Sequence, residues 1–210
     1  MVPIRVTEVL NYFKEPWYID WVHRVGRTEA NKISKASMKV GTEVDKIIKE
    51  NVSGNYLPEK HKNKEVENCI EAYKKWFKVY QPKSITPCTR LYSTIEGHEV
   101  TGEPDLMVDG VLVDIKCSSK ISPSYWLQVN MYSILHNIQA NNLDFDTVYK
   151  LLKLKKPHKV GILRFDKITA SYEYVLQDYS PSLVDCWVGL MRAFYYYKGE
   201  DNGGLDVQEG

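Results

Sequence analysis

Apolar residues recur at helical spacing through most of the first 80 residues. A short helix is expected before Pro16, and residues 17–50 and 64–80 carry further apolar positions three and four residues apart. A polar segment, residues 51–62, separates the two long stretches and contains glycine and proline. The pattern predicts that residues 1–82 form a helical N-terminal part.

From residue 83 on, shorter apolar runs alternate with turn residues, which favours strands with helices between them. The order predicts one α/β (α+β) domain, residues 1–198, in which a mixed central β-sheet flanked by helices occupies residues 83–198. The glycine-rich, acidic residues 199–210 are expected to form a flexible tail. The expected elements are strands at about 89–95 and 98–105, a hairpin around Asp109-Gly110, a helix after Ser122-Pro123, strands at 159–165 and 171–177, and a helix at 182–197.

The most informative stretch is residues 102–116, GEPDLMVDGVLVDIK. Asp109-Gly110 is a strong signal for a two-residue type I′ turn, since both turn positions need a positive φ. In the resulting register Leu106 pairs with Val113, and Asp105 lies opposite Asp114. The two carboxylates then emerge on one face with their Cβ atoms about 5 Å apart.

Two facing carboxylates repel each other, and a divalent cation between them turns that repulsion into ligation. Lys116 emerges on the same face one pleat away and adds a positive charge. This combination is suited to stabilising the charge that develops on a phosphoryl group under attack. The alternative is an exposed hairpin face that carries charges, with Asp105 as a turn residue.

The 210 residues are 43% hydrophobic, which is enough for one domain with a substantial core. No apolar run is long enough for a transmembrane helix, and the N-terminus lacks a signal-peptide pattern, so an intracellular, cytoplasmic protein without membrane contact is expected. The four cysteines form no C-x-x-C pair and are expected to be reduced core residues.

Pro104-Asp105 followed by Asp114-Ile115-Lys116 resembles the signature of the PD-(D/E)XK nuclease superfamily. Gln128 and Tyr132, twelve and sixteen residues past the lysine, resemble the extra Q-x-x-x-Y motif of the RecB-type branch. That branch includes phage exonucleases and the mitochondrial genome maintenance exonuclease. The resemblance covers about residues 5–135.

The resemblance implies a Mg²⁺ or Mn²⁺ site with one or two ions, held by Asp105, Asp114 and the backbone carbonyl of Ile115. Lys116 is implied to orient or help deprotonate the attacking water. Gln128 and Tyr132 are implied to fix the phosphate backbone or the metal-bound water. Packing and hydrogen bonding at a seam between helix and sheet is the alternative role for these last two.

Asp45 stands where this branch commonly has a histidine, four residues after Gly41. It is expected either to be a third metal ligand or to cap a helix or form a salt bridge. The related CRISPR-associated nucleases hold an iron–sulfur cluster with one N-terminal cysteine and a C-terminal group of three. That cysteine pattern is absent from this sequence, so no cluster is expected.

The implied function is a metal-dependent deoxyribonuclease, an exonuclease of recombination, repair or phage DNA processing. A single-strand or structure-selective endonuclease is the alternative within the same class. A nuclease-fold DNA-binding protein without activity is the alternative from another class, although such proteins usually lack an acid or the lysine. DNA is the expected partner, and a homo-oligomer stays open.

The formal net charge is only +1, so attraction of DNA requires locally concentrated basic residues. The densest basic segment, residues 150–167, contains Lys153, Lys155 and Lys156, which are expected to contact DNA phosphates. Tyr125, on the same helix face as Gln128 and Tyr132, is a further candidate for DNA contact. A solvated surface is the alternative interpretation of the lysines.

Overall fold

The computed structural model describes residues 2–55, 57–154 and 158–199. None of the helices in these ranges is long and apolar enough to span a membrane. In chain order the elements are β1 (Ile4–Arg5), α1 (Val6–Tyr12), α2 (Pro16–Val25), α3 (Arg27–Val52), α4 (Lys64–Tyr80), β2 (Ile85–Pro87), β3 (Leu91–Ile95), β4 (His98–Gly102), β5 (Leu106–Val108), β6 (Val111–Cys117), α5 (Pro123–Asn141), α6 (Phe145–Leu154), β7 (Lys159–Phe165), β8 (Tyr172–Asp178) and α7 (Pro181–Lys198).

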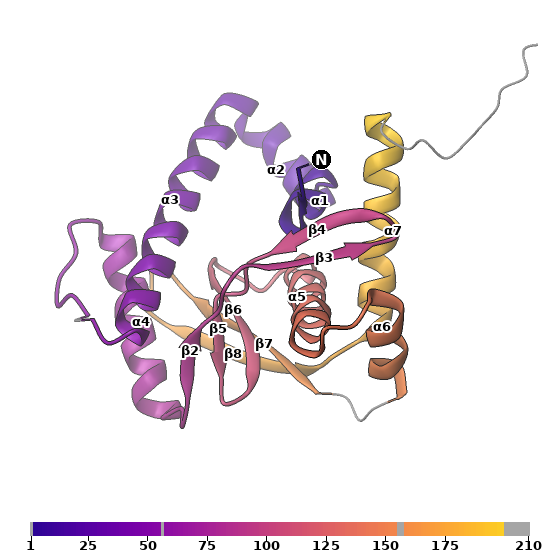
Figure 1. Ribbon diagram of the computed structural model, residues 1–210. Coiled ribbons are helices and arrows are strands. Elements are labelled where there is room, and N and C mark those ends of the chain that lie inside the picture. The colour runs from indigo at the N-terminus through magenta and orange to yellow at the C-terminus, as the bar shows by residue number, and fades with distance from the viewer. Residues whose placement is uncertain (1, 56, 155–157, 200–210) are drawn as a thin grey trace, which may run out of the picture.

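The strands form two sheets. The larger has the order β2-β5-β6-β7-β8, with β6 and β7 parallel and the other neighbours antiparallel. The smaller has the order β1-β4-β3, with β1 parallel to β4. Helix α5 contacts strands of both sheets and lies between them (Figure 1). The expected α/β fold with a mixed sheet flanked by helices is therefore confirmed.

Each face of the larger sheet packs on its own set of helices. Leu106, Val113 and Phe165 belong to a core shared with α3 and α4, whereas Val160 and Ile162 belong to a core shared with α1, α5 and α7. Figure 1 shows α3 and α4 on one side of the larger sheet and α5 and α7 on the other. Side chains on alternate positions of β6 therefore face α5 on one side and α3 and α4 on the other.

The hairpin has the register expected from Asp109-Gly110. Leu106 pairs with Val113, and both turn residues have a positive φ, 49° at Asp109 and 80° at Gly110. The expectation of one continuous strand to Asp105 is wrong, because β4 ends at Gly102 and β5 begins at Leu106. The three intervening residues carry the chain from the smaller sheet to the larger one.

The expectation that residues 17–50 are mostly helical is confirmed, although Gly26, with a φ of 84°, divides them into α2 and α3. Helix α6 was not expected, although Asp144 accepts a hydrogen bond from the Thr147 N–H (2.8 Å) and so caps its first turn. Most of the expected flexible tail, residues 200–210, lies outside the described residues.

The turn glycine gives a test of the hairpin. Replacing Gly110 by alanine is expected to lower the free energy of unfolding by about 1 kcal/mol, because a Cβ is unfavourable at positive φ. Gly189 is the matched control, since it lies exposed in α7 with open space around its Cα, and Gly189→Ala is expected to stabilise the protein by about 0.5–1 kcal/mol. Urea unfolding of both variants measures the difference, and equal effects would contradict the turn geometry.

Candidate active site

The candidate site lies on the face of β6 that α5 covers. Asp114 and Lys116 alternate with Val113 and Ile115, whose side chains pack toward α3 and α4. The Asp114 side chain is almost fully buried, with a residue exposure of 1%. Its Oδ2 lies 2.5 Å from Lys116 Nζ. A buried carboxylate and a buried ammonium group are thus paired at the carboxyl end of the strand.

Asp105 is held opposite Asp114 by the backbone rather than by a strand of its own. Its Oδ2 accepts a hydrogen bond from the Ile115 N–H (2.6 Å), and its carbonyl accepts one from the Cys88 N–H (3.0 Å). The Ile115 N–H and carbonyl point to the same side of the strand, so the carbonyl also faces the edge where Asp105 lies. The structure therefore brings Asp105, Asp114 and Ile115 together, as the hairpin register implies.

Helix α5 supplies polar side chains to this pair. The Gln128 side-chain amide donates to Asp114 Oδ1 (3.1 Å) and to the Tyr132 hydroxyl (2.9 Å). Both residues face the sheet because they are four residues apart, about one helical turn. Tyr125 lies one turn earlier, and Lys116 Nζ is 5.0 Å from the centre of its ring.

Helix α3 adds Asp45, together with a lysine that the sequence did not single out. Lys49 Nζ lies 3.0 Å from Asp45 Oδ2, 3.5 Å from Asp105 Oδ1 and 3.9 Å from Glu103 Oε1. The signal for Lys49 was its position four residues after Asp45, which places the two on one helix face. Asp45 therefore forms a salt bridge, the alternative to its expected role as a metal ligand, and it also lies near Asp105, so the ligand role stays a prediction.

Burial, together with the crowding of like charges, raises the pKa of two of these acids. Burial and then the charge of Asp105 raise the pKa of Asp45 to about 6, although Lys49 opposes the change. Burial raises the pKa of Asp114 to about 7, with Asp105 adding to the shift and Lys116 opposing it. The site thus holds more negative charge than its two lysines neutralise, which a bound cation would relieve.

The donor set fits a hard divalent cation held mainly by two carboxylates. Within the described ranges there is no group of three or more His, Cys, Asp or Glu side chains that could hold a metal ion. Mg²⁺ needs fewer protein ligands, since it usually keeps several waters beside one or two carboxylates. Among the described residues, the buried oxygen Asp45 Oδ1 has no hydrogen-bond partner, and Asp114 Oδ2 has only its ion pair with Lys116, so ligating atoms remain available.

Tyr132 packs against a glycine that ends β4. A Cβ added to Gly102 would lie 2.6 Å from Cε1 of Tyr132 and 3.2 Å from Leu135. The smaller sheet therefore fixes the position of Tyr132, and through it that of Gln128.

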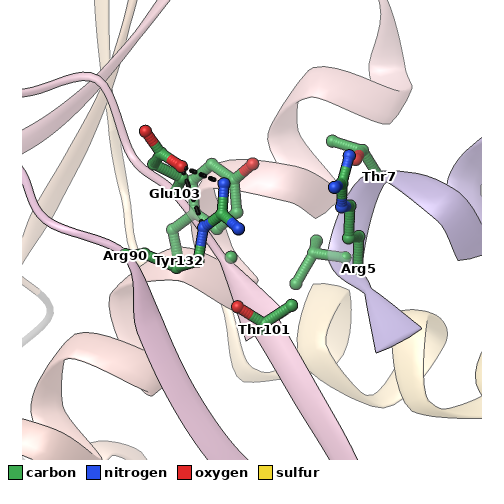
Figure 2. A pocket seen from close by; sticks show the side chains of 8 residues that line it. Arg5, Thr7, Arg90, Thr101, Glu103 and Tyr132 are labelled. Carbon is green, nitrogen blue, oxygen red and sulfur yellow. Dashed lines mark hydrogen bonds and ion pairs between the residues drawn. The ribbon is translucent and has the colours of Figure 1, made fainter. Parts of the chain in front are cut away.

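A cavity of about 160 Å³ opens beside Tyr132, and Figure 2 shows its labelled lining residues. Arg90 is joined to Glu103 by two hydrogen bonds, from Nε (3.0 Å) and Nη2 (2.6 Å). Arg5 approaches the cavity from another element, β1, and Thr101 lies between the two arginines in this view (Figure 2). Two guanidinium groups thus flank the space next to the candidate site.

The structure places Lys153 and Lys159, in the first part of the basic segment, away from this cluster. Lys153 lies near the end of α6, with Nζ 4.0 Å from Asp185 of α7. Strand β7 starts after this segment and runs parallel to β6, so its first residue lies at the opposite end of the sheet from Lys116. Lys155 and Lys156 lie outside the described residues.

No protein-family model matches the chain, and no curated protein matches it. Among the solved structures that match, an alkaline exonuclease from Laribacter hongkongensis has a TM-score of 0.46 and 13% sequence identity, with 93% of this chain and 87% of that chain covered. A phage related exonuclease from Haemophilus somnus has a TM-score of 0.36 and 14% identity, with 93% of each chain covered. Both TM-scores are under 0.5, so neither likeness decides what this chain does.

The raised pKa of Asp45 predicts a dependence of stability on pH. The folded state holds this proton more tightly than the unfolded chain does, so the ionised carboxylate destabilises the fold above about pH 6, and the penalty disappears as the pH falls toward 3.8. Asp45→Asn is therefore expected to raise the free energy of unfolding by on the order of 1 kcal/mol at pH 8 in EDTA, and by less at pH about 4.5. Urea unfolding at the two pH values measures this.

Asp20→Asn is the control for that experiment, because Asp20 is exposed on α2. It is expected to change stability by less than about 0.5 kcal/mol at either pH. A loss of stability in Asp45→Asn at pH 8 would contradict the charge crowding described above.

The contact between Gly102 and Tyr132 gives a second test. Gly102→Ala is expected to lower the free energy of unfolding by about 1–3 kcal/mol, because the added methyl group forces the buried ring or the strand to move. Gly41→Ala is the control, since nothing lies within 4 Å of a Cβ at that helical position. A fully stable Gly102→Ala variant would show that Tyr132 is not held from this side.

Proposed function

We propose that the protein is a Mg²⁺- or Mn²⁺-dependent deoxyribonuclease that hydrolyses DNA phosphodiester bonds. The single observation that carries the proposal is the pair Asp105 and Asp114, held opposite each other with Lys116 beside them. A sheet selected only for stability avoids two carboxylates that face each other, because like charges repel. A cation held by the two acids would explain the arrangement. That cation and Lys116 would then act together on a phosphate group.

The residues that would hold the cation are Asp105, Asp114 and the backbone carbonyl of Ile115, with Asp45 as a further ligand. The cation would lower the pKa of a bound water and polarise the phosphate to be cleaved. The unpaired oxygen of Asp45 supports this assignment, as does the chemistry of the donor set, which is oxygen only.

The protein's own side chains have separate roles in the proposed reaction. Lys116 is already paired with Asp114, and the charges of the surrounding acids hold its pKa above the ordinary value even though burial alone would lower it. It therefore stays protonated and neutralises charge on the phosphate oxygens in the transition state. Gln128 holds Asp114 in place, and Tyr132 holds Gln128.

The motif Pro104-Asp105, Asp114-Ile115-Lys116 and Gln128-x-x-x-Tyr132 supports assignment to the PD-(D/E)XK superfamily and its RecB-type branch. Within it we propose an exonuclease that acts in recombination, repair or phage DNA processing. The arginines beside Tyr132 support binding of the phosphate backbone next to the site. We also propose that Lys153, Lys155 and Lys156 contact DNA phosphates. These phosphates would lie at a distance from the cleaved bond.

Activity measurements test the proposal. Asp114→Asn is expected to abolish cleavage of end-labelled DNA, and Lys116→Ala to slow it by about 10²-fold or more, the usual effect of losing one electrostatic partner of the transition state. EDTA is expected to stop cleavage, and Mg²⁺ or Mn²⁺ to restore it. Lys74→Ala, on α4, is the matched control and is expected to cleave at the wild-type rate.

Linear and circular DNA in the same assay separate an exonuclease from an endonuclease, since only the latter cleaves the circle. Wild-type protein that binds DNA but does not cleave it with either metal would refute the nuclease. That result would support the alternative, a DNA-binding protein without activity. Near wild-type cleavage by Lys116→Ala would overturn the role assigned to this lysine.

A further inference from the structure

Helix α2 carries large aromatic side chains that the fold does not use. None of its ten residues is buried, although they include Trp17, Tyr18 and Trp21. Trp17 is 47% exposed, which is high for so large an apolar side chain. Figure 1 shows α2 and the adjoining end of α3 standing away from the larger sheet. An aromatic helix face that contributes no buried residue to the described fold is suited to an external ligand.

These side chains line a groove of about 670 Å³ between α2, α3 and the loop that follows β6. The groove reaches the candidate active site, because its lining includes Cys117, which follows Lys116, and also Tyr125. The Tyr125 ring lies 5.0 Å from Lys116 Nζ. A strand in the groove would therefore lead directly to the proposed cleavage position.

The charge of the groove is positive. Arg24, Lys120 and Lys167 line it, and no aspartate or glutamate is among the described residues that do so. Lys120 Nζ lies 5.2 Å from the centre of the Trp17 ring, so a cation and an aromatic face adjoin each other. Lys167 also contacts Ser37 and Glu65, which fixes its position at the far side of the groove.

Aromatic rings interleaved with cations match one kind of occupant. The bases of a single strand are free to stack on aromatic side chains while its phosphates meet the cations. In a duplex the base faces are stacked on one another and cannot reach Trp17 or Trp21. Charge complementarity thus selects a polyanion, and the exposed Trp17 ring with the half-buried Trp21 ring beside it selects one with unpaired bases.

We propose that this groove binds unpaired nucleotides of a DNA strand and guides them to Lys116. The proposal rests on the proposed function only for the choice of DNA and for the direction of the strand. Binding of unpaired bases in the groove is a separate property, which is measured without metal and without cleavage.

The test uses the full chain in EDTA with a fluorescein-labelled oligothymidylate and a blunt duplex of the same length. Trp17→Ala and Trp21→Ala are each expected to weaken binding of the single strand about tenfold, the scale of losing one stacked base, and to weaken duplex binding less than about twofold. Tyr197→Ala is the matched control, since Tyr197 is an exposed aromatic residue of α7 outside the groove, and no change is expected.

Tryptophan fluorescence gives a second readout. Oligothymidylate is expected to quench part of the emission, and the quenching should shrink in Trp17→Phe and Trp21→Phe, whereas the fully buried Trp76 and Trp187 are inaccessible to bases. The phenylalanine variants should bind the single strand better than the alanine variants, because a ring remains to stack on. All four variants should fold, since α2 contributes no buried residue.

Three outcomes would overturn the proposal. Unchanged single-strand binding in both alanine variants would show that the groove is not the site. Equal losses on single strand and duplex would show general attraction of DNA instead. Unchanged DNA binding with a shift from dimer to monomer, measured by sedimentation, would show that the groove joins two copies of the chain.

The cleavage assay keeps this proposal distinct from the proposed function. Wild-type protein that binds single strands through Trp17 and Trp21 but cleaves nothing would refute the nuclease and leave the groove intact. Protein that cleaves DNA, with the same preference between single strand and duplex in the alanine variants, would refute the groove and leave the nuclease intact.

Discussion

The repulsion between Asp105 and Asp114 is the constraint on which the candidate site depends. The turn at Asp109-Gly110 sets the hairpin register, which pairs Leu106 with Val113 and so brings Asp105, just before the strand, to the level of Asp114. Hydrogen bonds from Ile115 and Gln128 then hold each carboxylate in place, and Lys116 offsets part of the charge. The turn residues thus determine the strand pairing, and the strand pairing in turn determines the electrostatics of the site.

Each of the two sheets positions different residues of the candidate site. The larger sheet carries Asp114 and Lys116, and the smaller one supports Tyr132 through the bare backbone of Gly102. Asp105 lies in the short link between the sheets, so its position depends on both. Because α5 contacts both sheets, a shift of either one relative to the helix changes the distances among the acids.

Sequence patterns were sufficient where a residue's role follows from local geometry. The hairpin register, the helical spacing of Gln128 and Tyr132, and the mixed sheet all follow from periodicity and turn residues. The contact of Lys49 with Asp105 does not follow from the sequence, because it joins segments more than fifty residues apart and no local pattern encodes such a contact. The break after Gly102 does have a local signal in Pro104, which has no N–H to donate to a sheet ladder and therefore disfavours a strand that continues to Asp105.

Because α2 has no buried residue, its side chains can affect what the protein binds without affecting whether the protein folds. Stability is not uniform across a structure, and a helix that contributes no buried residue can open at little cost to the rest. Substitutions along α2 therefore escape the selection for core packing that restrains the sheets. If the groove at α2 selects the ligand, as proposed, this selection can diverge while the residues of β6 stay unchanged.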